Sequence, residues 1–274
     1  MYRTILLSCC LCAPSLVGLA AVSGAPTASM SAAQIVERNI AARGGSSGWR
    51  AVKTLSWTGK MDVGGNNRQT LAMPAPKSKT PMPPPRPTEQ VQVPFIMELE
   101  RPRKLRLEIQ FAGQTAVQVY DGTQGWKVRP FLNRHEVEQY TPQELQAAAA
   151  QAELDGPLID YAAKGTSVAL EGSDMVGGQP AYKLKLTMKD KQVQHVWIDA
   201  KTFLEVKMDG TPRRLDGRMH LVSVYLRDYK TVSGLVMPML YETAVEGVSA
   251  TEKINIDAVV VNPKLPDSHF AKPG

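Results

Sequence analysis

The sequence predicts a mainly β fold with helices, of the α+β class, and three observations lead to this prediction. Apolar and polar residues alternate through most of the 274-residue chain, with turn-forming residues between the alternating runs. Strong helix-start signals stand at only two places, Ser31 and Thr141. These patterns indicate roughly ten strands and two helical regions, and an antiparallel sheet this wide tends to curl or close.

The clearest strand pattern lies in residues 103–131. Four apolar residues alternate there with charged and polar ones, which places them on one face of an extended chain: Leu105, Leu107, Ile109 and Phe111. Turn residues at 112–114 and 121–122 separate the next two strands, which we expect to continue that face with Val117, Val119 and Trp126. The stretch therefore predicts an antiparallel meander with one broad apolar face.

The first 25 residues have the charged, apolar and small-residue regions of a secretory signal peptide. All three cysteines lie inside this segment, so we expect the mature protein to contain no thiol and to reside in a bacterial periplasm. The apolar run before Cys9 is too short for a lipoprotein processing site, so we expect no lipid anchor.

The amino-acid composition and net charge of the chain limit the kinds of molecule that it is expected to bind. The chain is 43% hydrophobic and 21% charged, which suits a globular protein with a sizeable core. Its formal charge of +6 is spread without a basic run, which argues against nucleic acid as a ligand. No stretch after the signal peptide approaches the roughly 18 consecutive apolar residues of a membrane-spanning helix. We also expect the protein to be a monomer.

In chain order, the first element is a helix from Ser31, with Gln34 in the capping-box position and a stop at residues 44–45. A strand follows in which Leu55, Trp57 and Met61 share one face. The stretch 73–88 is too rich in proline for a central strand and too polar for a core, so we expect a solvent-exposed excursion there. A partner-binding polyproline segment is the alternative.

The second half begins with a helix capped by Thr141, because proline follows at once and Glu144 stands at the third helical position. An alanine-rich run extends this helix, and residues 158–164 suggest a second helical piece that ends at Gly165. Strand patterns then return to the end of the chain, the first of them with three residues on one face: Tyr182, Leu184 and Leu186.

The usual catalytic and metal-binding motifs are absent, so we expect no enzyme, no cofactor and no metal site. His195 and Asp199 lie about 13 Å apart along one strand, too far to share an ion, and are interpreted as surface groups. Asp121 and Asp209 each precede glycine and are interpreted as turn residues. Trp57 and Trp126 each fit either an ordinary core, which is the more common role of an inward aromatic residue, or a stacking contact with a ligand.

Several short sequence motifs resemble those of a known family of exported proteins. They are AARGG at 41–45 with WRAVKTL at 49–55, YDG at 120–122 with GW at 125–126, LDGPL at 154–158, and VNP at 261–263 with HF at 269–270. They look like the outer-membrane lipoprotein-sorting family, the LolA/LolB-like superfamily of periplasmic lipoprotein carriers. The resemblance implies one domain over 26–274: a curved, unclosed antiparallel β half-barrel whose concave face is covered by helices, with acyl chains held between. The proline-rich stretch and the long central helical region depart from the compact carriers, and their lid-holding arginine matches no position here.

The resulting hypothesis is a non-enzymatic periplasmic carrier that shields acyl chains of a lipoprotein or lipid. Outer-membrane lipoprotein sorting is its candidate role, and an inner- or outer-membrane protein is a candidate partner. Its expected hydrophobic cavity is lined by Trp57, Met61, Leu105, Leu107, Ile109, Phe111, Val117, Val119, Trp126, Tyr182, Leu184 and Leu186. One alternative is an envelope-stress sensor or regulatory binding protein that uses the same cavity. The other is a β-rich structural protein whose apolar faces form a dry core, and the methionines of the strands suit either a cavity or a core.

Overall fold

We describe the protein from a computed structural model that covers residues 30–64, 90–215 and 217–274. The expected signal peptide at 1–25 and the expected proline-rich excursion at 73–88 lie outside these described residues. No helix among the described residues combines the length and apolar character that crossing a membrane requires.

Both predicted helix starts are confirmed. Helix α1 (Ala32–Ala42) begins at Ser31, whose hydroxyl accepts from the backbone N–H of Gln34 while the Gln34 side chain accepts from the Ser31 N–H at 2.9 Å. Helix α3 (Pro142–Gln151) begins with the same reciprocal pair between Thr141 and Glu144. Each pair satisfies two N–H groups that a helix start leaves without partners. A short helix, α2 (Ser46–Ala51), follows α1.

The helical piece predicted at 158–164 is wrong, because those residues form turns. Asp160 has a positive φ of 53°, which a helix does not allow, and its carboxylate binds the Arg50 guanidinium. The local pattern did not indicate this positive φ, and the pair with Arg50 is a tertiary contact made from that conformation.

Thirteen of the described strands form one antiparallel sheet. Their bounds are β1 (Thr54–Gly64), β2 (Gln90–Glu100), β3 (Lys104–Phe111), β4 (Gln114–Tyr120), β5 (Gly125–Arg129), β6 (Arg134–Gln139), β7 (Ser167–Val176), β8 (Gln179–Thr187), β9 (Val193–Asp199), β10 (Glu205–Asp209), β13 (Val222–Val232), β14 (Leu235–Val245) and β15 (Glu252–Val261). A separate hairpin consists of β11 (Arg213–Leu215) and β12 (Arg218–His220), and 3₁₀ turns lie at η1 (Pro130–Leu132) and η2 (Asp267–Phe270).

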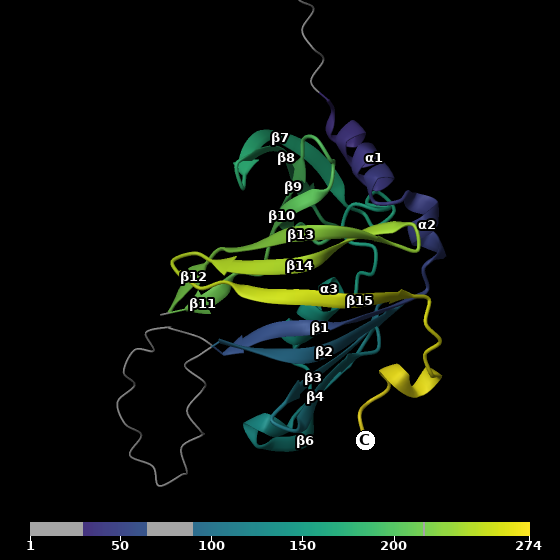
Figure 1. Cartoon of the computed structure of the whole chain (residues 1–274), viewed down its shortest axis with the longest axis vertical. Coiled ribbons are helices and arrows are strands. Elements are labelled where there is room, and N and C mark those ends of the chain that lie inside the picture. The colour runs from purple at the N-terminus through teal and green to yellow at the C-terminus, as the bar shows by residue number, and fades with distance from the viewer. Residues whose placement is uncertain (1–29, 65–89, 216) are drawn as a thin grey trace, which may run out of the picture. The chain divides into compact units, whose positions relative to one another are not determined.

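The sheet order is β6-β5-β4-β3-β2-β1-β15-β14-β13-β10-β9-β8-β7. It is two meanders joined where the last strand, β15, pairs with the first, β1. Strands β6 and β7 are its two unpaired edges, so the curved sheet does not close into a barrel (Figure 1). Helix α3 packs against β3, β4 and β5, which marks the inner, concave face. The predicted fold class, a half-barrel with helices on its concave face, is confirmed.

The alternation of apolar and polar residues did not predict two elements of the structure. Strand β6 has the sequence RHEVEQ, in which a single apolar residue gives no alternation, and it is placed by pairing with β5. The β11–β12 hairpin is only three residues long on each side. Short or polar strands of this kind take their structure from a neighbouring strand rather than from their own periodicity.

The join between the two meanders uses residues that carry the family resemblance. The side-chain oxygen of Asn262 accepts the backbone N–H of Lys53 at 2.7 Å, and the Asn262 N–H donates to the carbonyl of Thr54 at 2.9 Å. Trp49 donates its indole N–H to the carbonyl of Arg43 at 2.9 Å and lies beneath the Arg43 guanidinium. These residues tie β15, β1 and the first two helices together, so their role here is structural.

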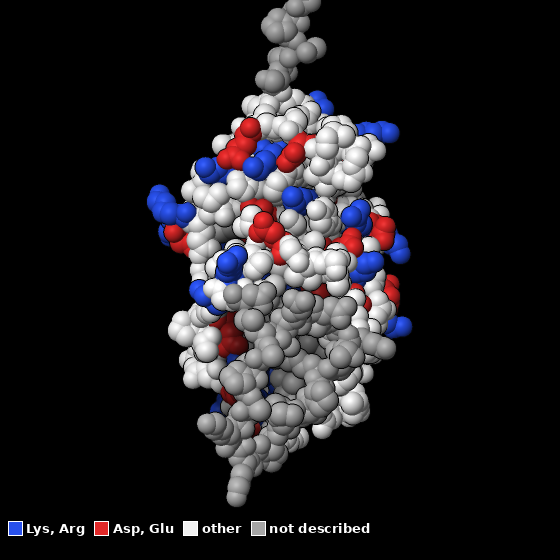
Figure 2. Space-filling view, turned by 90° about the vertical axis from the view of Figure 1, so that its left-hand side faces the viewer, with Lys and Arg blue, Asp and Glu red and all other residues white. Residues whose placement is uncertain are grey.

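The C-terminal segment lies on the outer face of the first meander. Arg106 donates to the carbonyl of His269 at 3.1 Å, and the adjacent Phe270 ring is buried beneath the Lys104 ammonium. On the part of the surface shown in Figure 2, basic and acidic residues are interspersed with uncharged ones.

Candidate functional site

The strand register decides which residues face inward. Leu105 pairs with Tyr120, Leu107 with Gln118, and residues directly opposite in an antiparallel pair share a face. Tyr120 is buried in the same cluster as both leucines, so this is the inner face.

Three residues predicted to continue this face lie on the other one, so that prediction is wrong for Val117, Val119 and Trp126. The two-residue turn pairs Phe111 with Gln114, so odd-numbered residues of β3 share a face with even-numbered residues of β4. Val119 therefore pairs with Arg106 and Trp126 on the outer face.

A continuous apolar surface covers the inner face of five adjacent strands, and we call it the apolar floor. It consists of Leu55, Trp57, Met61, Phe95, Met97, Leu99, Leu105, Leu107, Ile109, Met237, Met239, Tyr241, Ile254 and Ile256. Five of the predicted lining residues, Trp57, Met61, Leu105, Leu107 and Ile109, come together in it. Above the floor pack Ala148 of α3 and two residues of the segment that follows it, Leu154 and Ile159.

Burial decreases along three floor strands in the same direction. On β3 the exposed fraction rises from 2% at Leu105 to 8% at Leu107, and Ile109 is only half-buried. On β1 Leu55 is fully buried, whereas Trp57 and Met61 are half-buried, and on β14 the same change ends at half-buried Tyr241. Met61, Ile254 and Tyr241 lie opposite one another across three strands, and these half-buried side chains form one open end of the floor. Strand β2 does not share this change, because Val93, opposite Met61, and Phe95, opposite Ile109, remain buried.

The other predicted lining residues lie elsewhere. Leu184 and Leu186 of β8 are fully buried, together with Val196 and Ile198 of β9, outside the cluster that contains the floor. Tyr182 is half-buried and stacks on Phe203 with ring centroids 6.2 Å apart. Phe111 is half-buried and meets the Phe131 ring edge-on at 5.8 Å, at the end of β3.

The inner face turns polar beyond β3, a feature that sequence reasoning missed. Lys127 of β5 is buried beneath α3, where its ammonium pairs with the Glu144 carboxylate and lies 5.9 Å from the Tyr140 ring. Burial, with Glu144 as a smaller contributor, raises the pKa of the Tyr140 hydroxyl to about 12. The sequence contains a feature that could have predicted this pair. A lysine at an inward position of a strand needs a partner of opposite charge, and Glu144 lies in the first turn of the helix that covers the strand.

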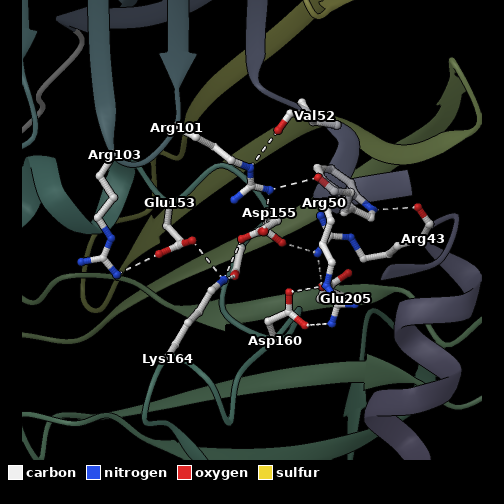
Figure 3. Close-up of polar contacts among 12 residues, drawn as sticks. Arg43, Arg50, Val52, Arg101, Arg103, Glu153, Asp155, Asp160, Lys164 and Glu205 are labelled. Atoms are coloured by element: carbon white, nitrogen blue, oxygen red, sulfur yellow. Dashed lines mark hydrogen bonds and ion pairs between the residues drawn. The ribbon is translucent and has the colours of Figure 1, made fainter. Parts of the chain in front are cut away.

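Charged residues fasten the segment after α3 to the sealed end of the floor (Figure 3). Asp155 is buried and binds Arg101 at 2.8 Å and Lys164 at 2.7 Å through its two carboxylate oxygens. Its carbonyl accepts from Arg43 at 3.0 Å, and Arg43 also pairs with buried Glu205 at 3.3 Å. We call Asp155 with these three cations, Arg43, Arg101 and Lys164, the clasp.

The clasp reaches three parts of the chain. Arg101, in the turn before β3, also donates to the carbonyls of Val52 at 2.8 Å and Trp49 at 3.0 Å. Burial disfavours ionisation of Asp155, but the hydrogen bonds from Lys164 and Arg101 outweigh it and hold the pKa of Asp155 below its ordinary value. The carboxylate therefore stays charged at neutral pH and joins the covering segment to the sheet.

The polar groups of the described residues do not form a metal-binding cluster. No three His, Cys, Asp or Glu residues in the described part of the chain are arranged to hold a metal ion. His195 lies beside Asp209, with 2.6 Å between Nδ1 and the carboxylate, and its other ring nitrogen is 3.3 Å from Glu171. Asp121 accepts from the backbone N–H groups of two following residues, which confirms it as a turn residue.

Comparison with known proteins identifies the fold. No family model and no curated protein matches the sequence. A LolA superfamily protein from Nitrosomonas europaea matches in structure with a TM-score of 0.55 at 14% identity, over 89% of this chain and 99% of that one. An outer-membrane lipoprotein-sorting protein domain from Vibrio parahaemolyticus matches with a TM-score of 0.54 at 12% identity, over 87% and 95%. A DUF1329 family protein from Desulfovibrio piger gives 0.54 at 12% identity, over 87% and 96%. The chain thus has the fold of LolA superfamily proteins.

Proposed function

We propose that this protein binds acyl chains of a lipoprotein or lipid on the apolar floor and shields them from water, without catalysis, in the bacterial periplasm. The observation that carries the proposal is the open end of the floor, where Met61, Ile109, Tyr241 and Ile254 continue a buried apolar surface toward solvent. An apolar surface that begins in the core and ends half-exposed fits a ligand that enters lengthwise.

The floor has the side chains that a hydrocarbon ligand needs. Burying each CH₂ group stabilises a complex by about 0.8 kcal/mol, so contact with half of a sixteen-carbon chain supplies roughly 6 kcal/mol. Four methionines project from the floor, Met61, Met97, Met237 and Met239. Their unbranched, flexible side chains adapt to chains of different length and curvature.

The cover over the floor makes few apolar contacts at α3, and the ion pair between Lys127 and Glu144 is the charged contact that holds the helix there. The helix presents small side chains to the cluster, Ala148 and Ala149, with Leu145 as its one large apolar residue there. Alanine buries little area, so few apolar contacts are lost when α3 moves away from the floor. The clasp lies after the helix, so α3 can be displaced by a ligand while the segment at Asp155 stays attached.

The names of two structural neighbours agree with this function, since one is a LolA superfamily protein and another a lipoprotein-sorting domain. A role in sorting lipoproteins to the outer membrane is the finer form of the proposal. It rests on the shared fold together with the apolar floor, and it requires a ligand whose acyl chains are transferred rather than stored.

The test is binding of an acylated peptide to the mature protein, measured by displacement of a fluorescent fatty-acyl probe. We expect Met61→Asp to abolish binding, because the change places a charge in the path of the chain. The matched control is Val260→Asp, since Val260 is 53% exposed on the adjacent strand and the residues before and after it face the floor. Equal binding by a folded Met61→Asp variant and the wild type would contradict the proposal.

A further inference from the structure

The apolar floor contains one buried hydrogen-bond donor without a partner. The indole Nε1 of Trp57 is shielded from solvent and makes no hydrogen bond. Two other indoles are bonded: Trp49 donates to the carbonyl of Arg43 at 2.9 Å and Trp197 to the carboxylate of Asp174 at 3.0 Å. An unpaired buried donor costs about 1–3 kcal/mol, so such groups are rarely left unpaired without a reason.

A second donor lies beside the first. The Tyr241 ring stacks on the Trp57 ring with centroids 6.1 Å apart and planes at 27°. The Tyr241 hydroxyl makes no hydrogen bond to the described residues. Burial raises the pKa of this hydroxyl, with smaller opposing effects from the charges of Arg43, which lowers it, and Glu205, which raises it, so the hydroxyl remains a neutral donor at physiological pH.

The residues in register with Trp57 offer no side-chain acceptor for its N–H. They are Met97 on β2 and Val259 on β15, both apolar. Trp57 and Tyr241 therefore present two neutral donors at the half-buried part of the apolar floor. A purely hydrocarbon ligand would leave both unsatisfied, whereas a carbonyl oxygen has two lone pairs and accepts from both.

We propose that Trp57 and Tyr241 bind the carbonyl oxygen of an ester-linked or amide-linked acyl chain, and so select acylated lipids over plain hydrocarbon. This inference rests on the proposed function, since it assigns the polar contact of a ligand whose chain lies on the floor. The acyl chain extends from the pair toward Leu105 and Leu55, where the floor is fully buried, and the linkage stays near the open end.

The first experiment compares methyl palmitate with hexadecane, which have similar chains but differ in the carbonyl. Affinities are measured by displacement of a fluorescent acyl probe from the wild type, Trp57→Phe and the control Trp197→Phe, whose indole lies outside the floor. We expect Trp57→Phe to weaken methyl palmitate binding about threefold to tenfold, the loss of one hydrogen bond, and to change hexadecane binding less than twofold. We expect Trp197→Phe to change both affinities less than twofold.

The outcomes separate the two proposals. Equal weakening of both ligands by Trp57→Phe overturns the carbonyl contact and leaves acyl binding intact. Failure of the wild type to bind either ligand overturns the proposed function itself, and the carbonyl contact with it.

A second readout detects the contact directly. The protein has four tryptophans, so the nitrogen-15 spectrum of its indole N–H groups contains four signals, and Trp57→Phe identifies the relevant one. We expect methyl palmitate to move the Trp57 proton signal downfield and hexadecane to leave it near its ligand-free position. Identical shifts with both ligands would overturn the inference.

The same variant distinguishes the source of the carbonyl. A diacylated lipopeptide and a diacyl phosphatidylglycerol with matched chains both carry ester carbonyls, so Trp57→Phe is expected to weaken both about threefold to tenfold. The ligand that the wild type binds more tightly identifies the class of molecule, lipoprotein or phospholipid, that supplies the carbonyl group. Unchanged affinity of Trp57→Phe for both ligands would overturn the inference.

Discussion

The inner face of the sheet has two parts that differ in their cover. Residues of β8 and β9, among them Leu184 and Ile198, are fully buried. The apolar floor on β1, β3 and β14 instead becomes half-exposed toward one end. The helices beside these parts start with the same capping box, but α1 buries Ile35 and Val36, whereas α3 buries only Ala148.

The comparison teaches that side-chain size, rather than helix formation, distinguishes a sealed core from a surface that a ligand can reach. Fully burying a Val or Ile side chain stabilises a fold by about 1.5–3 kcal/mol, whereas an alanine methyl contributes far less. Helix α1 is therefore a permanent part of its core, whereas α3 is, under the proposed function, the cover that an acyl chain displaces.

The largest expected effect tests the sealed part. Leu184→Ala should lower the free energy of unfolding by about 2–5 kcal/mol, because it leaves a cavity among fully buried neighbours, and should leave acyl affinity unchanged. Met61→Ala at the open end should cost about 1 kcal/mol or less while weakening acyl binding. Urea unfolding and probe displacement on the same samples measure both quantities. Similar losses of stability in the two variants would remove the distinction between the two parts.

The next effect concerns the clasp that joins the covering segment to the sheet. Asp155→Ala should lower the free energy of unfolding by about 2–3 kcal/mol, because it leaves Arg101 and Lys164 without their buried partner. The control is Arg50→Ala, which breaks the exposed pair with Asp160 and should cost much less. If the two variants unfold at the same urea concentration, the clasp does not hold the cover.

A third change makes α3 resemble α1. Ala148→Leu adds apolar volume above the floor, where it should displace about two CH₂ groups of bound chain and weaken acyl binding about tenfold. Stability should change by less than about 1 kcal/mol if α3 has room to move outward, whereas a tightly packed dry core would lose about 1–3 kcal/mol to overpacking. Calorimetry thus separates the carrier from a dry-core structural protein.

The smallest expected effect is the decrease in folding stability at acidic pH that Asp155 contributes. The pKa of Asp155 is lower in the folded protein than its ordinary value of 3.8, so the unfolded chain binds the proton more readily. Its contribution to stability is therefore complete above pH 3.8 and is lost as the pH falls through the folded pKa. We expect Asp155→Asn to flatten the decline of stability below pH 3.8 and to leave the relative loss above pH 5 constant. A decline identical to that of the wild type would show that other carboxylates control acid unfolding.

The sequence predicted features whose cause is local. The caps at Ser31 and Thr141 depend on hydrogen bonds between residues three apart, and both helices begin where the pattern indicated. Alternation along β1 and β3 placed Leu55, Trp57 and Leu107 on the face that the structure buries. The resemblance to the lipoprotein-sorting family matched the fold as well, since its motifs mark the joins between elements.

The features that only the tertiary structure decided depend on distant parts of the chain. A two-residue turn after β3 put Val119 and Trp126 on the outer face, because register, and not apolar character, determines which way a side chain points. The same register turns Lys127 inward, where Glu144 of α3 pairs with it, and Asp160, which has a positive φ, contacts Arg50 from a distant helix. Trp57 shows the limit of local pattern most clearly. Its alternation predicted burial on the inner face, but only the tertiary packing, in which Tyr241 stacks on the ring, left its indole N–H buried without a hydrogen-bond partner.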